Sequence, residues 1–181
     1  MINSRVLAID DDLDILETYR RILGNSENQG IQALNMFAVE GSSRADSGEE
    51  NFELTEVNQG MDGVEAVSRS LSEGRPYAVV FVDMRMPPGI DGLETAKRIR
   101  DLDDRIHIIV VTAYSDHSVN EMQNALQHDL LLARKPLTSD EILQLARNAC
   151  IGWSRTAADR VGQPFVSGDA AENESVAHPS D

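Results

Sequence analysis

The chain has 181 residues, enough for one domain of ordinary size with a hydrophobic core and too few for a second beside its polar stretches. Its 16 basic and 31 acidic residues give a formal net charge of -15, which disfavours binding to nucleic acid or to an anionic membrane. We find no signal-peptide core and no run long enough to span a bilayer, so we expect a cytoplasmic protein. The single cysteine, Cys150, has no internal disulfide partner and is expected to be a small buried side chain on the last predicted helix.

The first ordered segment is a short apolar run. Residues 6–9, Val-Leu-Ala-Ile, stop at three aspartates in positions 10–12, as a strand buried on both faces of a parallel sheet would. Apolar residues then recur at helical spacing over 13–23, and Gly24 stands where a helix would stop. The sequence therefore predicts a strand followed by a helix.

A long polar stretch follows this helix. Residues 25–50 are rich in Gly, Ser, Asn and acidic residues, with one brief apolar patch at 33–39. A loop of this length is uncommon inside a compact domain. We interpret it as a flexible insertion between the first helix and the second strand.

Strand and helix patterns alternate again from residue 52 to about residue 150. Strict apolar and polar alternation at 52–57 indicates a strand at or near a sheet edge, and helical spacing follows at 61–71. Three later apolar runs indicate strands in the core, at 78–82, 106–111 and 130–133. Capping residues begin a helix after each of these strands, at 91–94, 118–121 and 138–141. The chain therefore contains five predicted strands and five predicted helices.

Two of the predicted helix starts share a sequence pattern. Residues 60–65, Gly-Met-Asp-Gly-Val-Glu, resemble residues 89–94, Gly-Ile-Asp-Gly-Leu-Glu. Shared capping chemistry explains the likeness better than duplication, because both segments need an acid that accepts amide hydrogens at a helix amino end.

Apolar periodicity is lost beyond Trp153. We therefore expect one domain over residues 1–152, with the flexible insertion at about 25–50, followed by a disordered tail over 153–181.

Five alternations of strand and helix predict an α/β fold, a parallel sheet covered by helices on both faces. In the doubly wound order 2-1-3-4-5, a crevice opens beyond the carboxyl ends of strands one and three. Those ends carry Asp10, Asp11 and Asp83. Three carboxylates in one crevice repel one another, and Mg2+, which prefers hard oxygen ligands, would relieve that repulsion.

Strands four and five end near the same crevice and deliver a hydroxyl, Thr112, and a mobile positive charge, Lys135. A carboxylate nucleophile, a cation and a lysine suit transfer of a phosphoryl group to Asp83. Taken singly, each motif is better explained as a capping turn, a strand end or a surface lysine. Only the joint order and spacing of these motifs point specifically to phosphoryl transfer.

Four motifs together resemble the CheY-like response regulator receiver domains of two-component signal transduction. They are Ile-Asp-Asp-Asp at 9–12, Val-Asp-Met-Arg-Met-Pro at 82–87, Val-Thr-Ala at 111–113 and Lys-Pro at 135–136. The resemblance spans residue 5 to about residue 150. It implies a flavodoxin-like fold whose five-stranded parallel sheet has the order 2-1-3-4-5.

The resemblance also implies a role for each residue of the acidic pocket. Asp83 would be the phosphoacceptor and a metal ligand, Asp11 a direct Mg2+ ligand and Asp10 a water-mediated one. Arg85 would contribute its backbone carbonyl to the ion.

Further positions follow from the same resemblance. Thr112 and Lys135 would hold the phosphoryl group, and the side chains of Arg85 and Tyr114 stand where receivers tune the lifetime of the phosphate. Leu132 takes the switch position, where the family usually has an aromatic residue.

The function implied is that of a single-domain response regulator. A sensor histidine kinase or a histidine phosphotransfer protein would donate the phosphoryl group from a phosphohistidine, and the signal would pass by binding a downstream protein or by phosphorelay. We expect no enzyme activity beyond self-catalysed phosphotransfer and autodephosphorylation. One departure affects the loop over the pocket: the common Pro-x-x-Asp-Gly turn has an extra residue at 87–92.

Two alternatives remain open. A degenerate receiver that binds its partner without phosphorylation is favoured by Leu132 and opposed by the intact acidic pocket. An aspartyl-phosphate hydrolase of the haloacid-dehalogenase class needs a second acid two residues after the nucleophile, where this chain has Arg85. The four histidines show no metal-ligand spacing and are assigned no role.

Overall fold

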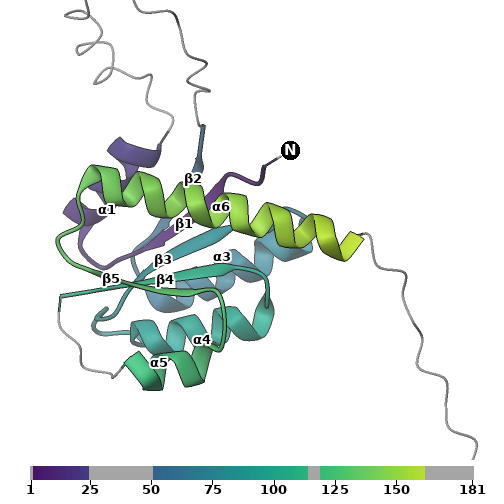
Figure 1. Ribbon diagram of the computed structural model, residues 1–181. Helices are drawn as coiled ribbons and strands as arrows, with labels where there is room; N and C mark the ends of the chain where they lie inside the picture. Colours follow the sequence, from purple (N-terminus) through teal and green to yellow (C-terminus); the bar gives the residue numbers. More distant parts are fainter. Residues whose placement is uncertain (1, 25–50, 114–118, 162–181) are drawn as a thin grey trace, which may run out of the picture.

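The structure is a computed structural model that describes residues 2–24, 51–113 and 119–161 (Figure 1). The predicted insertion at about 25–50 and the chain beyond residue 161 lie outside the described residues. Within them, five strands and five helices alternate: β1 (Arg5–Ile9), α1 (Leu13–Leu23), β2 (Glu53–Val57), α3 (Gly60–Ser72), β3 (Val79–Asp83), α4 (Gly92–Leu102), β4 (His107–Thr112), α5 (Val119–Leu126), β5 (Leu130–Arg134) and α6 (Ser139–Val161). The number and order of these strands and helices agree with the prediction.

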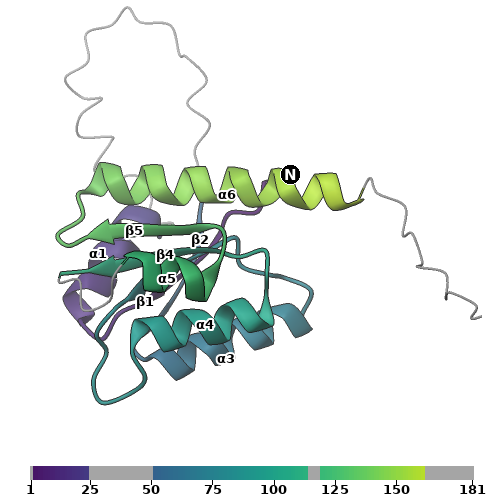
Figure 2. The ribbon, with the colours of Figure 1, turned by 60° about the horizontal axis from the view of Figure 1, so that its bottom comes forward.

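The strands form one parallel sheet in the order β2-β1-β3-β4-β5. Helices α1 and α6 cover one face, and α3, α4 and α5 cover the other (Figure 2). This confirms the predicted doubly wound fold. It also confirms that the alternating strand at 52–57 lies at an edge of the sheet.

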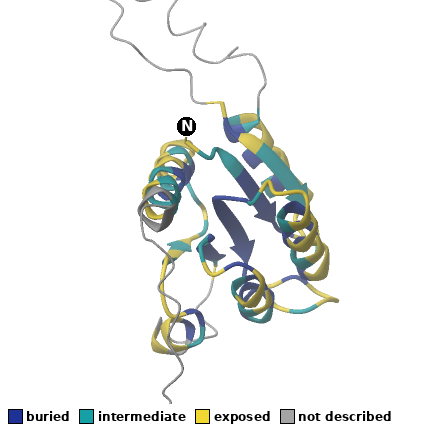
Figure 3. Cartoon of the chain, turned by 90° about the vertical axis from the view of Figure 1, so that its right-hand side faces the viewer, coloured by how far each residue is buried: buried dark blue, intermediate teal, exposed yellow. Residues whose placement is uncertain are grey.

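The continuous apolar runs are explained by burial on both faces of the sheet. All five residues of β3 are buried, and the buried central strands lie between helices on either side in Figure 3. Val80 and Val82 face the α3, α4 and α5 side, whereas Val79 and Phe81 face the α1 and α6 side. Since successive side chains point to opposite faces, a strand covered twice needs apolar residues at every position.

Side-chain caps begin α4 and α6 where the sequence predicts them, α3 begins without one, and the cap predicted at residue 118 lies outside the described residues. The Asp91 carboxylate accepts a hydrogen bond from the Glu94 backbone N–H at 2.8 Å. At the start of α6, the Glu141 carboxylate accepts from the Thr138 backbone N–H at 2.8 Å. The Glu141 N–H donates in turn to the Thr138 hydroxyl at 3.3 Å. This reciprocal pair is a capping box that satisfies amide groups with no partner inside the helix.

The prediction that the run 130–132 is core is wrong for two of its residues. Leu131 is 46% exposed and Leu132 is 36% exposed. Their strand, β5, is the other edge of the sheet and pairs only with β4. Leu130, by contrast, packs against the core on the α3, α4 and α5 side. An apolar run can therefore mark an edge strand as well as a central one.

The last helix is longer than predicted. Residues 153–161, expected as the start of a disordered tail, continue α6 to Val161. Trp153 packs against the core on the α1 and α6 side, and the Arg105 guanidinium lies 5.6 Å from the centre of its ring. The hydroxyl of Ser154 accepts a hydrogen bond from the Asn3 backbone N–H at 2.9 Å. Cys150 is 2% exposed, which confirms it as a small buried side chain.

Among the described residues, no helix combines the length and the apolar character that a bilayer crossing requires.

Candidate functional site

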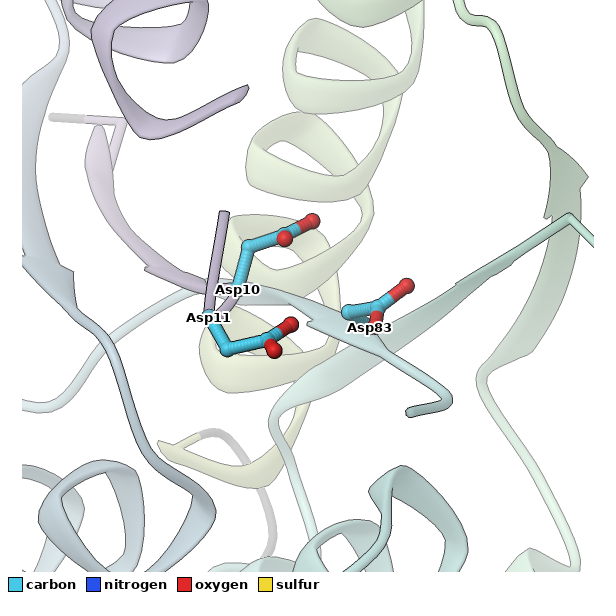
Figure 4. A group of neighbouring side chains, drawn as sticks. All are labelled: Asp10, Asp11 and Asp83. Carbon is cyan, nitrogen blue, oxygen red and sulfur yellow. The ribbon is translucent and has the colours of Figure 1, made fainter. Parts of the chain in front are cut away.

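Three carboxylates meet where two adjacent strands end. Ile9 of β1 pairs in register with Val82 of β3, so the next residues, Asp10 and Asp83, emerge side by side. Asp11 follows in the chain and joins them (Figure 4). Each of the three offers an oxygen, and these oxygens all lie within 4.8 Å of one another. The predicted acidic pocket is therefore present.

Burial makes this arrangement costly without a positive charge. Asp10 is 1% exposed and Asp83 is 7% exposed. The Lys135 ammonium supplies that charge, with Nζ 2.7 Å from Asp10 Oδ2 and 2.8 Å from Asp83 Oδ1. A buried carboxylate without such a partner would carry an uncompensated charge in a medium of low dielectric constant.

Backbone amides bind the remaining carboxylate oxygens. The Asp12 N–H donates to Asp10 Oδ1 at 3.0 Å, and the Arg85 N–H donates to Asp83 Oδ2 at 2.9 Å. Each carboxylate is thus held at one oxygen by an amide and at the other by the ammonium. Both side chains are fixed in orientation before any ligand arrives.

The pKa values of the pocket reflect this competition between burial and charge. Burial raises the pKa of Asp10 above its usual value, although Lys135 and the Asp12 N–H act against the rise. Burial by itself would lower the pKa of Lys135, but its hydrogen bonds to Asp10 and Asp83 outweigh that effect and raise it. Lys135 therefore stays protonated at neutral pH.

The donor set of the pocket fits a hard divalent cation. Carboxylate and backbone carbonyl oxygens are the ligands that Mg2+ and Ca2+ prefer, and Mg2+ commonly keeps several waters. Asp10, Asp11 and Asp83 could hold the ion, with the backbone carbonyl of Arg85 as a further oxygen. Lys135 is the group that already neutralises two of these carboxylates.

Neighbouring strands deliver the other predicted residues. Thr112 ends β4, and its carbonyl accepts a hydrogen bond from the Lys135 N–H at 2.9 Å, which joins the two strand ends. Leu132 lies opposite Val110 in the sheet, on the exposed edge strand. Tyr114 lies outside the described residues, so its predicted role is untested.

Two features of the site were not singled out from the sequence. Tyr19, which lies within the helix predicted over 13–23, is buried with its ring 5.2 Å from that of Phe81. Burial raises the pKa of its hydroxyl, and the negative charges of Asp10 and Asp83 raise it further. Tyr19 and Lys135 share a cavity of about 200 Å³ between α1 and α6. Helical periodicity reveals such a residue only as apolar.

Gly92 is the second such feature. A Cβ at this position would run into the carbonyl oxygen of Asp83 and would lie 2.8 Å from the Cα of Met84. The Gly92 N–H donates to the Met84 carbonyl at 2.9 Å. Only glycine lets α4 begin this close to the residue that follows the buried strand. The signal in the sequence was the glycine directly after the capping Asp91.

Comparison with known proteins identifies the family. The response regulator receiver domain matches residues 35–147, more than half of the chain, so the protein belongs to this family. The match begins after β1, and the structure adds Asp10 and Asp11, from outside it, to the pocket around Asp83. Receiver domains accept a phosphoryl group in two-component signalling and bind Mg2+ at an acidic pocket.

Curated relatives agree with this assignment, and a solved structure shares the fold. Sporulation initiation phosphotransferase F of Bacillus subtilis is 26% identical over 78% of this chain and 90% of its own length. Response regulator MprA of Mycobacterium leprae is 32% identical over 79% of this chain, which spans only 49% of that relative. A CheY-like receiver domain from Methanospirillum hungatei shares the fold, with a TM-score of 0.59 and 17% identity over 84% of this chain and 98% of its own.

Proposed function

We propose that this protein is a response regulator that accepts a phosphoryl group on Asp83 from a phosphohistidine donor with the help of Mg2+. The observation that carries the proposal is the convergence of three carboxylates and one lysine at the ends of adjacent parallel strands. Such a set positions a nucleophile among groups that neutralise a transferred phosphoryl group.

In the proposed reaction, an oxygen of Asp83 attacks phosphorus as the bond from phosphorus to the donor's imidazole nitrogen breaks. The electron pair of the broken bond stays on that nitrogen. Lys135, 2.8 Å from Asp83 Oδ1, is placed to contact a phosphoryl oxygen, and the Thr112 hydroxyl would donate to another. Mg2+, when bound by Asp10, Asp11 and Asp83, would supply the positive charge that the transferred oxygens need.

The partners follow from the donor chemistry. A sensor histidine kinase or a histidine phosphotransfer protein would supply the phosphohistidine, and the protein would act in the cytoplasm. The Bacillus relative is called a phosphotransferase, which supports onward phosphotransfer as one output, with binding to a downstream protein as the other. We propose no enzyme activity beyond self-catalysed phosphotransfer and autodephosphorylation.

A degenerate receiver remains the alternative. The aliphatic Leu132 at the switch position, 36% exposed on an edge strand, favours it. Such a protein would bind its partner without phosphorylation, although its pocket retains both acids, the acceptor and the lysine.

The test is the intact mass of the protein after incubation with acetyl phosphate and Mg2+. We expect wild type to gain one phosphoryl group, and we expect no gain for Asp83→Asn or when a chelator replaces the metal. The matched control is Asp101→Asn, which changes an exposed aspartate on α4 and should leave the gain unchanged. Absence of the adduct on wild type, also with a competent kinase as donor, would refute the proposal and favour the alternative.

A further inference from the structure

The two similar helix starts of the sequence pack against each other beside the acidic pocket. A Cβ on Gly60, at the start of α3, would run into the Thr95 hydroxyl of α4 and would lie 2.9 Å from Ile90. That hydroxyl donates to the Asp91 carbonyl at 2.7 Å, so α3 is pressed against the cap of α4. The expectation of shared capping is wrong: the Asp91 carboxylate caps α4, whereas Asp62 lies inside the first turn of α3, and α3 has no side-chain cap.

Gln59, the N-cap residue of α3, does not act as a cap. Its side chain makes no capping hydrogen bond, and Ser, Thr, Asp or Asn would serve a helix start better. Instead, its amide Nε2 donates to the Pro87 carbonyl at 3.4 Å, across to the loop between β3 and α4. A Cβ on Gly89 would lie 2.5 Å from Gln59 Oε1, so the amide rests directly on that glycine.

The loop in contact with Gln59 is the one that follows Asp83. Its second amide, from Arg85, donates to Asp83 Oδ2 at 2.9 Å. In the middle of the loop, the Gly89 N–H donates to the Met86 carbonyl at 3.1 Å and forms a turn. The Met86 side chain is buried in the core and is 2% exposed. Pro87 is exposed and lies four residues after Asp83. A contact that fixes Pro87 therefore restrains the backbone that binds the acceptor carboxylate.

We infer that Gln59 is a positioning residue that holds the loop after Asp83 in the geometry needed for phosphoryl transfer. The inference rests on the proposed function and deepens it. This loop contains the segment 87–92, which has one residue more than the Pro-x-x-Asp-Gly turn common in receiver domains. The amide of Gln59 and the absence of a side chain at Gly89 together fit the longer loop against α3.

The test measures the rate at which Asp83 gains a phosphoryl group from acetyl phosphate with Mg2+. Gln59→Ala removes the hydrogen bond and should slow phosphorylation about twofold to tenfold, the range that one ordinary hydrogen bond supports. Gly89→Ala should displace the Gln59 amide and slow phosphorylation to the same extent. The double variant should be no slower than either single one, because both changes break the same contact.

A further variant separates positioning from fold stability. Gln59→Glu keeps the length of the side chain, loses the donor and places a negative charge at the amino end of α3, where charge stabilises the helix. We expect slower phosphorylation with undiminished thermal stability. A purely structural role predicts unchanged rates for this variant. Gln144→Ala, at an exposed glutamine on α6, is the matched control and should match wild type in both measurements.

The outcomes distinguish this inference from the proposed function. If wild type gains no phosphoryl group on Asp83, both are overturned. If wild type gains it and the Gln59 variants react at the wild-type rate, the inference alone fails. Additive losses in Gln59→Ala and Gly89→Ala would also overturn it, since they would place the two residues in separate contacts.

Discussion

Replacing Lys135 by methionine tests the electrostatic account of the pocket. Lys135 Nζ contacts one oxygen of Asp10 and one of Asp83, at 2.7 Å and 2.8 Å, and these side chains are only 2% and 8% exposed. Methionine has a similar length and no charge. Lys135→Met should therefore leave two buried carboxylates beside each other without their shared cation, in the absence of a divalent ion.

The magnitude follows from the cost of breaking a buried ion pair. Removing one partner costs about 3–5 kcal/mol in general, and we expect about 3 kcal/mol here because the lysine side chain is 21% exposed. In a domain of this size, that loss lowers the melting temperature by about 6–12 °C. Thermal unfolding followed by circular dichroism, in the presence of a chelator, measures it. Saturating Mg2+ should stabilise the variant more than wild type, because its carboxylates begin without a cation.

A second lysine in the chain provides the control for Lys135→Met. Its two lysines are Lys97 and Lys135, and Lys97 lies half-buried on α4. Lys97→Met should change the melting temperature little and should not alter the response to Mg2+. A Lys135→Met protein as stable as wild type without metal, or one with the same gain from Mg2+, would refute the electrostatic account.

Two further predictions concern packing and pH. Gly92→Ala forces a Cβ against the carbonyl of Asp83, where only backbone could move aside, and should cost about 1–3 kcal/mol in the free energy of unfolding measured with urea. An unchanged free energy would contradict the close approach of α4. Burial lowers the pKa of His107, against the opposing charge of Asp129, so the unfolded chain binds the proton more tightly. Stability contributed by neutral His107 should be present above about pH 6.5 and be lost as the pH falls toward the lowered value. The free energy of unfolding, measured with urea at a series of pH values, should depend less on pH in this range for His107→Gln than for wild type. An equal pH dependence in the two proteins would contradict the prediction.

The acidic pocket could be predicted because its residues are tied to strand ends. Asp10 and Asp83 each follow a fully apolar run, and parallel strands bring their carboxyl ends to one edge of the sheet. Lys135 could be assigned in the same way from the end of the last strand. The capping residues Asp91 and Thr138 act within one turn of chain, so local sequence was enough for them.

Burial at the sheet's second edge could not be predicted in this way. The run 130–132 is as apolar as the central strands, yet Leu131 and Leu132 are exposed because no strand follows β5 in the sheet. The end of α6 was also misplaced. Trp153 and Ser154 extend the helix through contacts with Arg105 and Asn3, which are distant in sequence and leave no periodic signal.

The sequence by itself determined the alternation of strands and helices, the doubly wound class and the identity of the acidic residues, because these depend on local periodicity and on the direction of parallel strands. Tertiary structure alone decided which carboxylate oxygens Lys135 contacts and how the loop after Asp83 is held. Lys135 reaches Asp10 across 125 positions of sequence, and Gln59 reaches Pro87 across 28. The partner atoms in such contacts depend on how the elements pack against one another.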